Sequence, residues 1–215
     1  MYTPTHFEES RLPELYEFMR RHPFASVIAS VSGRLDANHV PLILDPALGP
    51  YGQLRGHIAR ANSMWRDVQA EAEVLVLFHG ANGYISPSWY ASKKEHGKVV
   101  PTWNYGVVHV RGRIAWVQDT QWLRRLVEEL TERHESGKPE PWQVSDAPDD
   151  YIRKMLEGIV GFEISIAEIK GKMKLSQNRT DADLSGIRRG ISNQADAGAA
   201  ELAKLMGGKV DGSGS

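Results

Sequence analysis

Residues 84–105 read YISPSWYASKKEHGKVVPTWNY and combine aromatic rings, short polar side chains and a basic loop. The segment holds five aromatic residues: Tyr84, Trp89, Tyr90, Trp103 and Tyr105. Flat apolar surfaces beside hydroxyl and amide groups suit a planar, partly polar ligand. The same composition suits a loop that closes the end of a barrel. The pattern alone therefore leaves a ligand site and a structural plug equally open.

The sequence on either side of this segment predicts a β-rich fold. Alternating or apolar runs predict about seven strands, at residues 24–31, 35–44, 54–58, 74–78, 84–86, 103–117 and 160–169. Residues 80–83 are expected to form a tight connection, and Pro41 indicates a sheet edge or a bulge. Residues 170–179, KGKMKLSQNR, could continue the last strand. Many short strands with helices inserted late indicate an antiparallel barrel rather than a βαβ fold.

Helices are expected at five places. Residues 11–21 carry an apolar stripe of helical spacing, and residues 195–206 predict a terminal helix. Asn62 or Ser63 is expected to cap a short helix, and Asp119 and Asp146 to cap two longer ones. No internal repeat or convincing domain boundary is visible. We therefore expect one domain over residues 1–190, followed by a C-terminal helix and tail over residues 191–215.

Composition excludes several classes of protein. The 215 residues contain 26 Lys and Arg against 27 Asp and Glu, so no global field attracts nucleic acid or a membrane. The chain has no cysteine, which excludes disulfides, thiolate nucleophiles, zinc ribbons and iron–sulfur clusters. The polar N-terminus is not a signal peptide, and no apolar run approaches the roughly 20 residues of a membrane span. We expect a soluble, cytoplasmic protein with no membrane partner.

Familiar catalytic signatures are missing from the sequence. G-x-S-x-G, H-E-x-x-H, P-loop and G-x-G-x-x-G patterns are absent, which argues against a Rossmann cofactor site and leaves the catalytic residues unknown. Four histidines lie in or beside predicted strands: His39, His57, His79 and His109. Without close ligand spacing, we favour separate hydrogen-bonded or surface histidines over a metal or haem set. No metal site is predicted.

A candidate phosphate site follows the third predicted strand. Arg55 and His57 are two residues apart and share one strand face, and Arg60 and Asn62 follow where a helix begins. Free amides at a helix start beside a guanidinium suit a phosphate, whereas the plainer alternative is a solvated basic edge with an ordinary Asn cap. A phosphate site plus a stacking platform fits flavin mononucleotide (FMN), although other phosphorylated aromatic ligands fit too. Further cations follow the last strand and could bind the ligand, face nucleic acid or form a solvated turn: Lys172, Lys174 and Arg179, with Gln177.

Several motifs, in one order, resemble a known family. They are HPFA at 22–25, ANHVPL at 37–42, LRGHIARAN at 54–62, YISPSWY, VPTWNY, WQVSDAP and GKMKLSQNR. Together they resemble the PaiB-type FMN-binding negative transcriptional regulators, over about residues 1–190. The resemblance implies a mainly β (α+β) fold, an antiparallel split β-barrel of FMN-binding type with peripheral helices. It also implies a homodimer with flavin sites at the subunit interface.

The resemblance also implies particular binding residues. It places the FMN phosphate on the 54–62 motif, which points to Arg55, His57, Arg60 and Asn62. It makes the two aromatic motifs the wall of the isoalloxazine site, which points to Ser86, Ser88, Trp89, Thr102, Trp103 and Asn104. Because the family is also similar to haem-oxygenase-type split barrels, haem stays an alternative to FMN.

Two functions from different classes follow. The first is a repressor that binds FMN, with DNA as a candidate partner. A DNA-binding protein needs a basic face or a recognition helix, and paired arginines occur at Arg124-Arg125 and Arg188-Arg189. The second is an FMN-dependent oxidoreductase acting on a small molecule, in which the flavin would carry the hydride chemistry. A haem-binding or haem-degrading protein is a third option.

Overall fold

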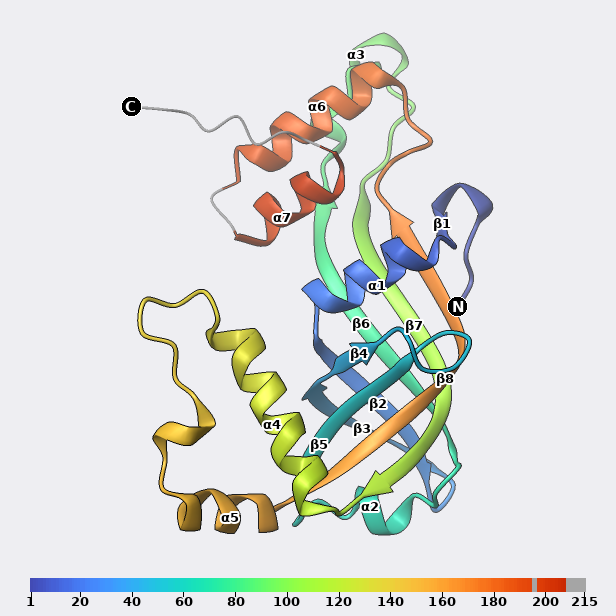
Figure 1. The fold of residues 1–215 in the computed structure, drawn as a ribbon. Coiled ribbons are helices and arrows are strands. Elements are labelled where there is room, and N and C mark those ends of the chain that lie inside the picture. Colours follow the sequence, from blue (N-terminus) through green and yellow to red (C-terminus); the bar gives the residue numbers. More distant parts are fainter. Residues whose placement is uncertain (195–196, 208–215) are drawn as a thin grey trace. The chain divides into compact units, whose positions relative to one another are not determined.

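The computed structural model describes residues 1–194 and 197–207 and is built around a single antiparallel sheet. The strands of these residues are β1 Glu8–Glu9, β2 Phe24–Val31, β3 Arg34–Pro41, β4 Ile43–Asp45, β5 Gln53–Ala59, β6 Glu73–Ile85, β7 Thr102–Val117 and β8 Ile159–Lys174. Their order is β3-β2-β6-β7-β8-β5-β4, with β1 paired to β8 (Figure 1). The predicted mainly β, antiparallel split barrel with peripheral helices is confirmed.

Short and long helices connect the strands. They are α1 Leu12–Arg21, α2 Met64–Asp67, α3 Ser92–His96, α4 Thr120–Glu135, α5 Asp149–Glu157, α6 Asp181–Ser192 and α7 Ala197–Leu205, with 3-10 turns η1 Thr5–Phe7, η2 Pro87–Trp89 and η3 Val144–Asp146. The predicted Asp119 cap of α4 is confirmed, because its carboxylate accepts a hydrogen bond from Trp122 N at 2.7 Å. Helix α6 was not predicted, although Ile187 and Ile191 have helical spacing.

The chain divides into two compact units. The first unit comprises residues 1–15, 79–108 and the chain from 170 onward, and the second comprises residues 16–78 and 109–169. Strands β6, β7 and β8 each contribute residues to both units. The single domain expected over residues 1–190 stays a prediction.

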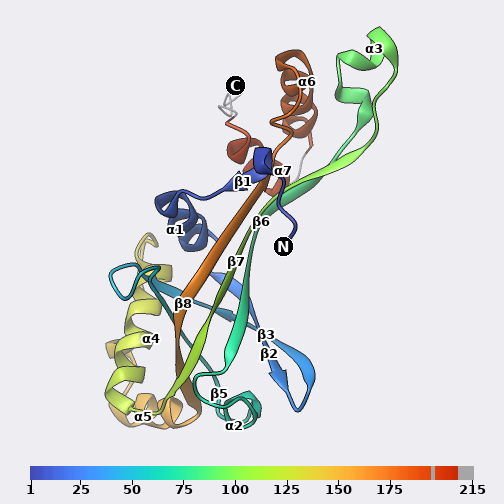
Figure 2. The same cartoon turned by 90° about the vertical axis from the view of Figure 1, so that its right-hand side faces the viewer.

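The second unit contains the interior of the barrel. Its buried apolar side chains alternate along the strands and include Leu54, Ile58, Val74, Val76, Phe78, Val110, Ile114, Val160, Phe162 and Ile164. Strands β2 and β3 form a hairpin whose turn has positive φ at Ser32 and Gly33 (Figure 2). Strands β3 and β4 are at opposite ends of the strand order yet are separated in sequence only by Leu42.

Three details of the sequence prediction were wrong. The single strand 35–44 is split, because Leu42 N donates to Pro23 O at 2.9 Å instead of continuing the ladder. Pro41 ends β3 at the sheet edge, as predicted. Residues 80–83 are not a turn, since β6 runs unbroken through them. Asp146 does not cap α5: its carboxylate accepts from Gln143 N at 2.8 Å within η3, and Pro148 holds the N-cap position of α5.

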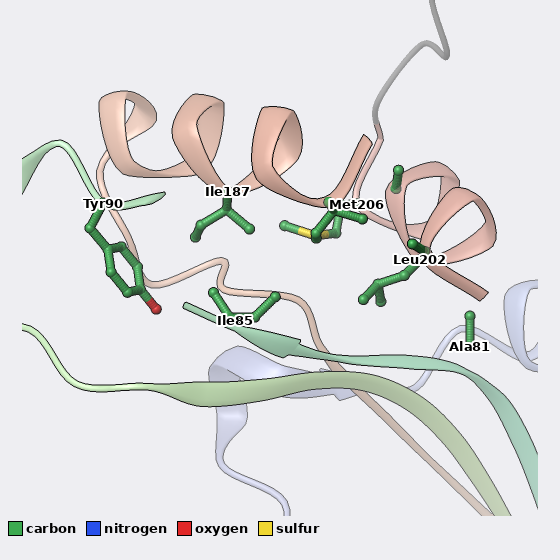
Figure 3. Packing of buried hydrophobic residues seen from close by; sticks show 9 residues of the cluster. Ala81, Ile85, Tyr90, Ile187, Leu202 and Met206 are labelled. Atoms are coloured by element: carbon green, nitrogen blue, oxygen red, sulfur yellow. The ribbon is translucent and has the colours of Figure 1, made fainter. Parts of the chain in front are cut away.

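The first unit has a separate apolar cluster formed by β6, η2, α6 and α7 (Figure 3). Its members are Ala81, Ile85, Tyr90, Ile187, Ile191, Ala199, Leu202, Ala203 and Met206. A Cβ added at Gly83 would lie 2.9 Å from Leu202 Cδ2, so this glycine permits close packing of α7. The terminal helix predicted over 195–206 is confirmed over 197–205, and residues 195–196 lie outside the described residues.

Over the described ranges, no helix has both the length and the apolar character that a bilayer crossing requires. The cytoplasmic location stays a prediction. The same residues bring no three His, Asp or Glu side chains together as a metal-binding group.

Candidate functional site

Arg55 and His57 lie in the second unit on one face of β5, as predicted, and this face packs against α4. Arg55 Nη2 donates to both carboxylate oxygens of Glu129 in α4, at 2.9 and 3.2 Å. Arg55 Nε is buried and has no hydrogen-bond partner among the described residues. Burial lowers the pKa of His57, which favours its neutral form. Both side chains are therefore half-buried between a strand and a helix.

Arg60 joins three separate parts of the second unit. Its Nε donates to Glu157 O at 2.7 Å, and its Nη2 donates to Ile159 O at 3.0 Å. Its Nη1 donates to Gln118 Oε1 at 2.9 Å, and the guanidinium lies 5.7 Å from the centroid of the Trp65 ring. Three of the five guanidinium N–H groups are thus used within the protein, two of them on backbone carbonyls where α5 ends and β8 begins.

Asn62 has both ends of its amide occupied. Its Oδ1 accepts from Met64 N at 2.9 Å, and its Nδ2 donates to Asn38 Oδ1 at 2.5 Å. The side chain of Asn62 therefore caps α2, although Ser63 holds the N-cap position. Helix α2 has four residues, so few peptide dipoles are aligned toward a ligand. The phosphate role predicted for the four residues of this segment stays a prediction.

In the first unit, the motif at 84–90 is held by its own turn and by α6. Ser86 Oγ accepts from Ser88 N at 3.2 Å and caps η2, while Ser88 Oγ accepts from Lys93 Nζ at 3.3 Å. Trp89 is half-buried against two glycines of α6. A Cβ at Gly190 would overlap the indole, with Trp89 Cγ at 2.5 Å, and a Cβ at Gly186 would overlap Trp89 O. One side of Trp89 is therefore occupied by α6.

Thr102 and Asn104, at the start of β7, contact residues on and just after β8. Thr102 Oγ1 accepts a hydrogen bond from Lys174 Nζ, which also donates to Trp103 O at 2.8 Å. Asn104 is fully buried: its Oδ1 accepts from Ser176 Oγ at 2.9 Å, and its Nδ2 donates to Met206 Sδ at 3.5 Å. Ser176 has φ +64°, a conformation that costs a non-glycine residue energy. Asn104 therefore faces the interior of the unit.

The opposite face of β7 carries a pocket. Side chains alternate along a strand, so Trp103 and Tyr105 point away from the face that buries Asn104. With β6 they form a cavity of 360 Å³, here named the outward pocket, lined by His79, Gly80, Asn82, Trp103, Tyr105, Gly106 and Val107. This volume is within the range of small-molecule sites. Trp103 is 53% exposed and meets the ring of Tyr84 edge-on, with centroids 6.3 Å apart.

Of the ten residues predicted to bind the cofactor, only Trp103 lines the outward pocket. His79, Asn82 and Tyr105 were not predicted. The alternation of residues 103–107 could have identified Tyr105, because it places Tyr105 on the face of Trp103. His79 and Asn82 gave no such signal, because residues 80–83 were interpreted as a turn.

Cations border the outward pocket within the first unit. Lys172 Nζ lies 5.5 Å from the centroid of the Tyr105 ring and donates to Tyr2 O at 3.0 Å. Burial lowers the pKa of Lys174; the positive charges of Lys172 and Arg179 act in the same direction, and Tyr105 opposes them. A planar aromatic surface thus stands next to groups that attract an anion.

Comparison with known proteins identifies the family. A family model described as "Putative FMN-binding domain" matches residues 1–168. The "Protease synthase and sporulation protein PAI 2" of Bacillus subtilis (strain 168) is 33% identical over 213 residues, covering 98% of both chains. The FAD and heme binding protein from Mycobacterium smegmatis has a TM-score of 0.59 at 15% identity, covering 83% of this chain and 78% of that one.

The flavocytochrome Anf3 from Azotobacter vinelandii has a TM-score of 0.55 at 14% identity, covering 83% of this chain and 75% of that one. At such identities the two structural likenesses show the fold alone, which is that of flavin-binding split barrels. The family match and the near full-length identity together answer which family the sequence motifs belong to. This chain belongs to the FMN-binding domain family, and its predicted PaiB-type resemblance is confirmed.

Proposed function

We propose that this protein binds FMN in the outward pocket and acts as a PaiB-type negative transcriptional regulator. The observation that carries the proposal is the pocket itself, in which the exposed ring of Trp103 and the half-buried ring of Tyr105 stand beside polar side chains. Trp103 and Tyr105 offer faces on which a ring system can stack, and His79 and Asn82 offer donors and acceptors for its polar edge.

The residues present fit a flavin. When bound, a flavin supplies electron and hydride transfer, or serves as a sensed ligand. The chain's own residues would bind the ring, orient its polar edge and shield one of its faces from water. His79 also supports haem as a second candidate ligand, because a histidine in a pocket can ligate haem iron.

We further propose a homodimer. The outward pocket is open to solvent, and Trp103, which lines it, is 53% exposed. Tyr84, whose ring meets Trp103 edge-on, is 45% exposed. Exposed aromatic side chains at one place on a surface favour a partner, and a second copy would shelter the ring. Sedimentation at micromolar concentration tests this proposal: we expect a dimer, and a monomer alone would contradict it.

A local excess of positive charge supports DNA as the partner of the regulator. The described residues of the first unit carry eleven Lys and Arg against seven Asp and Glu, although the whole chain has a net charge of −1. Such an excess can attract phosphates while the summed charge hides it. This observation favours the regulator over the oxidoreductase, because cations beyond those that hold a flavin phosphate suit DNA better than a small-molecule substrate.

Two measurements test the proposed function. The visible spectrum of the purified protein, followed by identification of the compound released on denaturation, is expected to reveal FMN; a Soret band would support haem instead. A gel shift with promoter DNA is expected to weaken steeply as salt rises. Reversing the charge of two exposed residues, Lys94→Glu with Lys98→Glu, should abolish the shift. Salt-independent or absent binding, together with consumption of a reduced nicotinamide, would favour the oxidoreductase.

A further inference from the structure

We infer that Lys172 and Lys174 hold the anionic end of the flavin beside the outward pocket, in place of the 55–62 segment. The inference rests on the flavin binding proposed above and assigns the phosphate end of that site. Its starting observation is that the aromatic surface and both lysines belong to one compact unit.

If a ring system stacks on Trp103 and Tyr105, a phosphate-bearing chain attached to that ring would reach the ammonium groups of Lys172 and Lys174. Lys172 Nζ is 5.5 Å from the Tyr105 centroid and 5.7 Å from the Tyr2 centroid. Lys174 Nζ donates to Thr102 Oγ1 and to the backbone oxygen of Trp103, the residue whose indole lines the pocket. Both lysines are on β8, two residues apart, and therefore share one face of the strand.

Both lysines keep donors for a ligand. An ammonium has three N–H groups. Lys172 uses one on Tyr2 O, and Lys174 uses two on Thr102 Oγ1 and Trp103 O. The pair can therefore offer three further N–H groups to phosphate oxygens. Lysine also serves phosphate as a compact point charge, without the fork geometry that arginine requires.

Electrostatics favours an anion at this place. Burial lowers the pKa of Lys174, and the positive charges of Lys172 and Arg179 act in the same direction. A bound phosphate would relieve the repulsion among these three cations. One opposing carboxylate is near: Glu8 of β1 is directly opposite Lys172 in the antiparallel register. Directly opposed residues share a sheet face, so Glu8 competes with the ligand for Lys172.

The side chains of the 55–62 segment are already held by internal hydrogen bonds, and turning them toward a phosphate would break some of these bonds. Arg60 donates to two backbone carbonyls and Gln118, Asn62 has both ends of its amide occupied, and Arg55 donates to Glu129. Withdrawing such donors leaves acceptors unpaired, at an energetic cost comparable to that of a lost hydrogen bond. Arg60 also has two unused N–H groups, so the lysines differ from it in lying in the first unit, with Lys172 near the Tyr105 ring and Lys174 on Trp103 O.

Comparing FMN with riboflavin, which lacks the phosphate, tests the inference. Lys172→Met should weaken FMN binding by about 10- to 100-fold, the scale of a charge-assisted bond, while riboflavin affinity changes less than about twofold. Lys172→Arg should keep most of the preference for FMN. Lys204→Met, which removes the same charge from an exposed position of α7 in the first unit, is the matched control and should leave both affinities unchanged. Glu8→Gln should strengthen FMN binding alone.

The possible results distinguish the proposed flavin binding from the assignment of the phosphate to Lys172 and Lys174. If the unaltered protein binds neither flavin, the proposed function is overturned and the lysine assignment with it. If it binds FMN, but Lys172→Met changes FMN and riboflavin affinity equally or changes neither, only the lysine assignment is overturned. A loss of affinity confined to FMN in Arg60→Ala, with none in Lys172→Met, would likewise overturn the lysine assignment.

Discussion

Replacing Gly190 by alanine tests whether the Trp89 side chain packs against α6. A Cβ at Gly190 would overlap Cγ, Cδ2 and Cε2 of the Trp89 indole, so the added methyl must displace a packed ring. Overpacking of this kind costs about 1–3 kcal/mol. At an exposed helix position, the same change would stabilise by about 1 kcal/mol through helix propensity. Because three ring atoms are overlapped, we expect the upper part of the range, with a net destabilisation of about 2 kcal/mol.

Urea unfolding followed by circular dichroism measures the effect, and the melting temperature should fall by about 4–8 °C for a chain of this size. Gly137→Ala is the control, since a Cβ there meets nothing within 4 Å. Gly190→Ala in a Trp89→Leu background should cost less than it does alone, by about 0.5–3 kcal/mol, because the smaller side chain leaves room for the methyl. If Gly190→Ala stabilises the protein, Trp89 does not pack on α6 and is free to form a ligand wall.

Three further substitutions test the hydrogen bonds of Asn104 and Arg60 and the burial of His57. Asn104→Ala leaves Ser176 Oγ without its acceptor in the interior and should lower the free energy of unfolding by about 2–3 kcal/mol; an unchanged urea midpoint would contradict the buried contact. Arg60→Met removes three hydrogen bonds and should cost about 3 kcal/mol of stability while leaving the FMN-to-riboflavin affinity ratio unchanged; a changed ratio would return the phosphate to that segment. Burial holds the pKa of His57 below its ordinary 6.5, so the unfolded chain binds more protons as the pH falls below that value. Stability is then full above pH 6.5 and declines below it, and His57→Gln should flatten this decline in urea titrations across the pH range; an identical decline would assign it to other groups.

The sequence predicted those parts of the fold whose pattern repeats locally. Alternation located β7, and helical spacing with an Asp cap located α4. Strand β6 was missed in its middle because glycines in a run usually mark a turn, whereas Gly83 serves the approach of Leu202 from α7. Close packing between segments more than 100 residues apart leaves no local signal.

The residue types chosen for the candidate site carry no information on their tertiary contacts, for the same physical reason. Trp89 and Trp103 look alike in the sequence, but α6 covers one and leaves the other exposed. Arg60 has the side chain of a phosphate ligand, but it donates to acceptors within the protein. Two of these acceptors, Glu157 O and Ile159 O, lie almost 100 residues further along the chain. Residue type and spacing can propose a ligand group, but only the tertiary contacts tell which donors are already used.

The central proposal is that the flavin ring stacks in the outward pocket, and fluorine NMR of protein labelled with 5-fluorotryptophan tests it most directly. The chain has six tryptophans, and a Trp→Phe variant of each assigns its signal. Trp103 lines the pocket, whereas Trp65 lies beside Arg60 in the other unit. On addition of FMN, we expect the Trp103 signal to shift and the Trp65 signal to stay in place. A Trp103 signal unchanged at saturating FMN would contradict the proposed pocket.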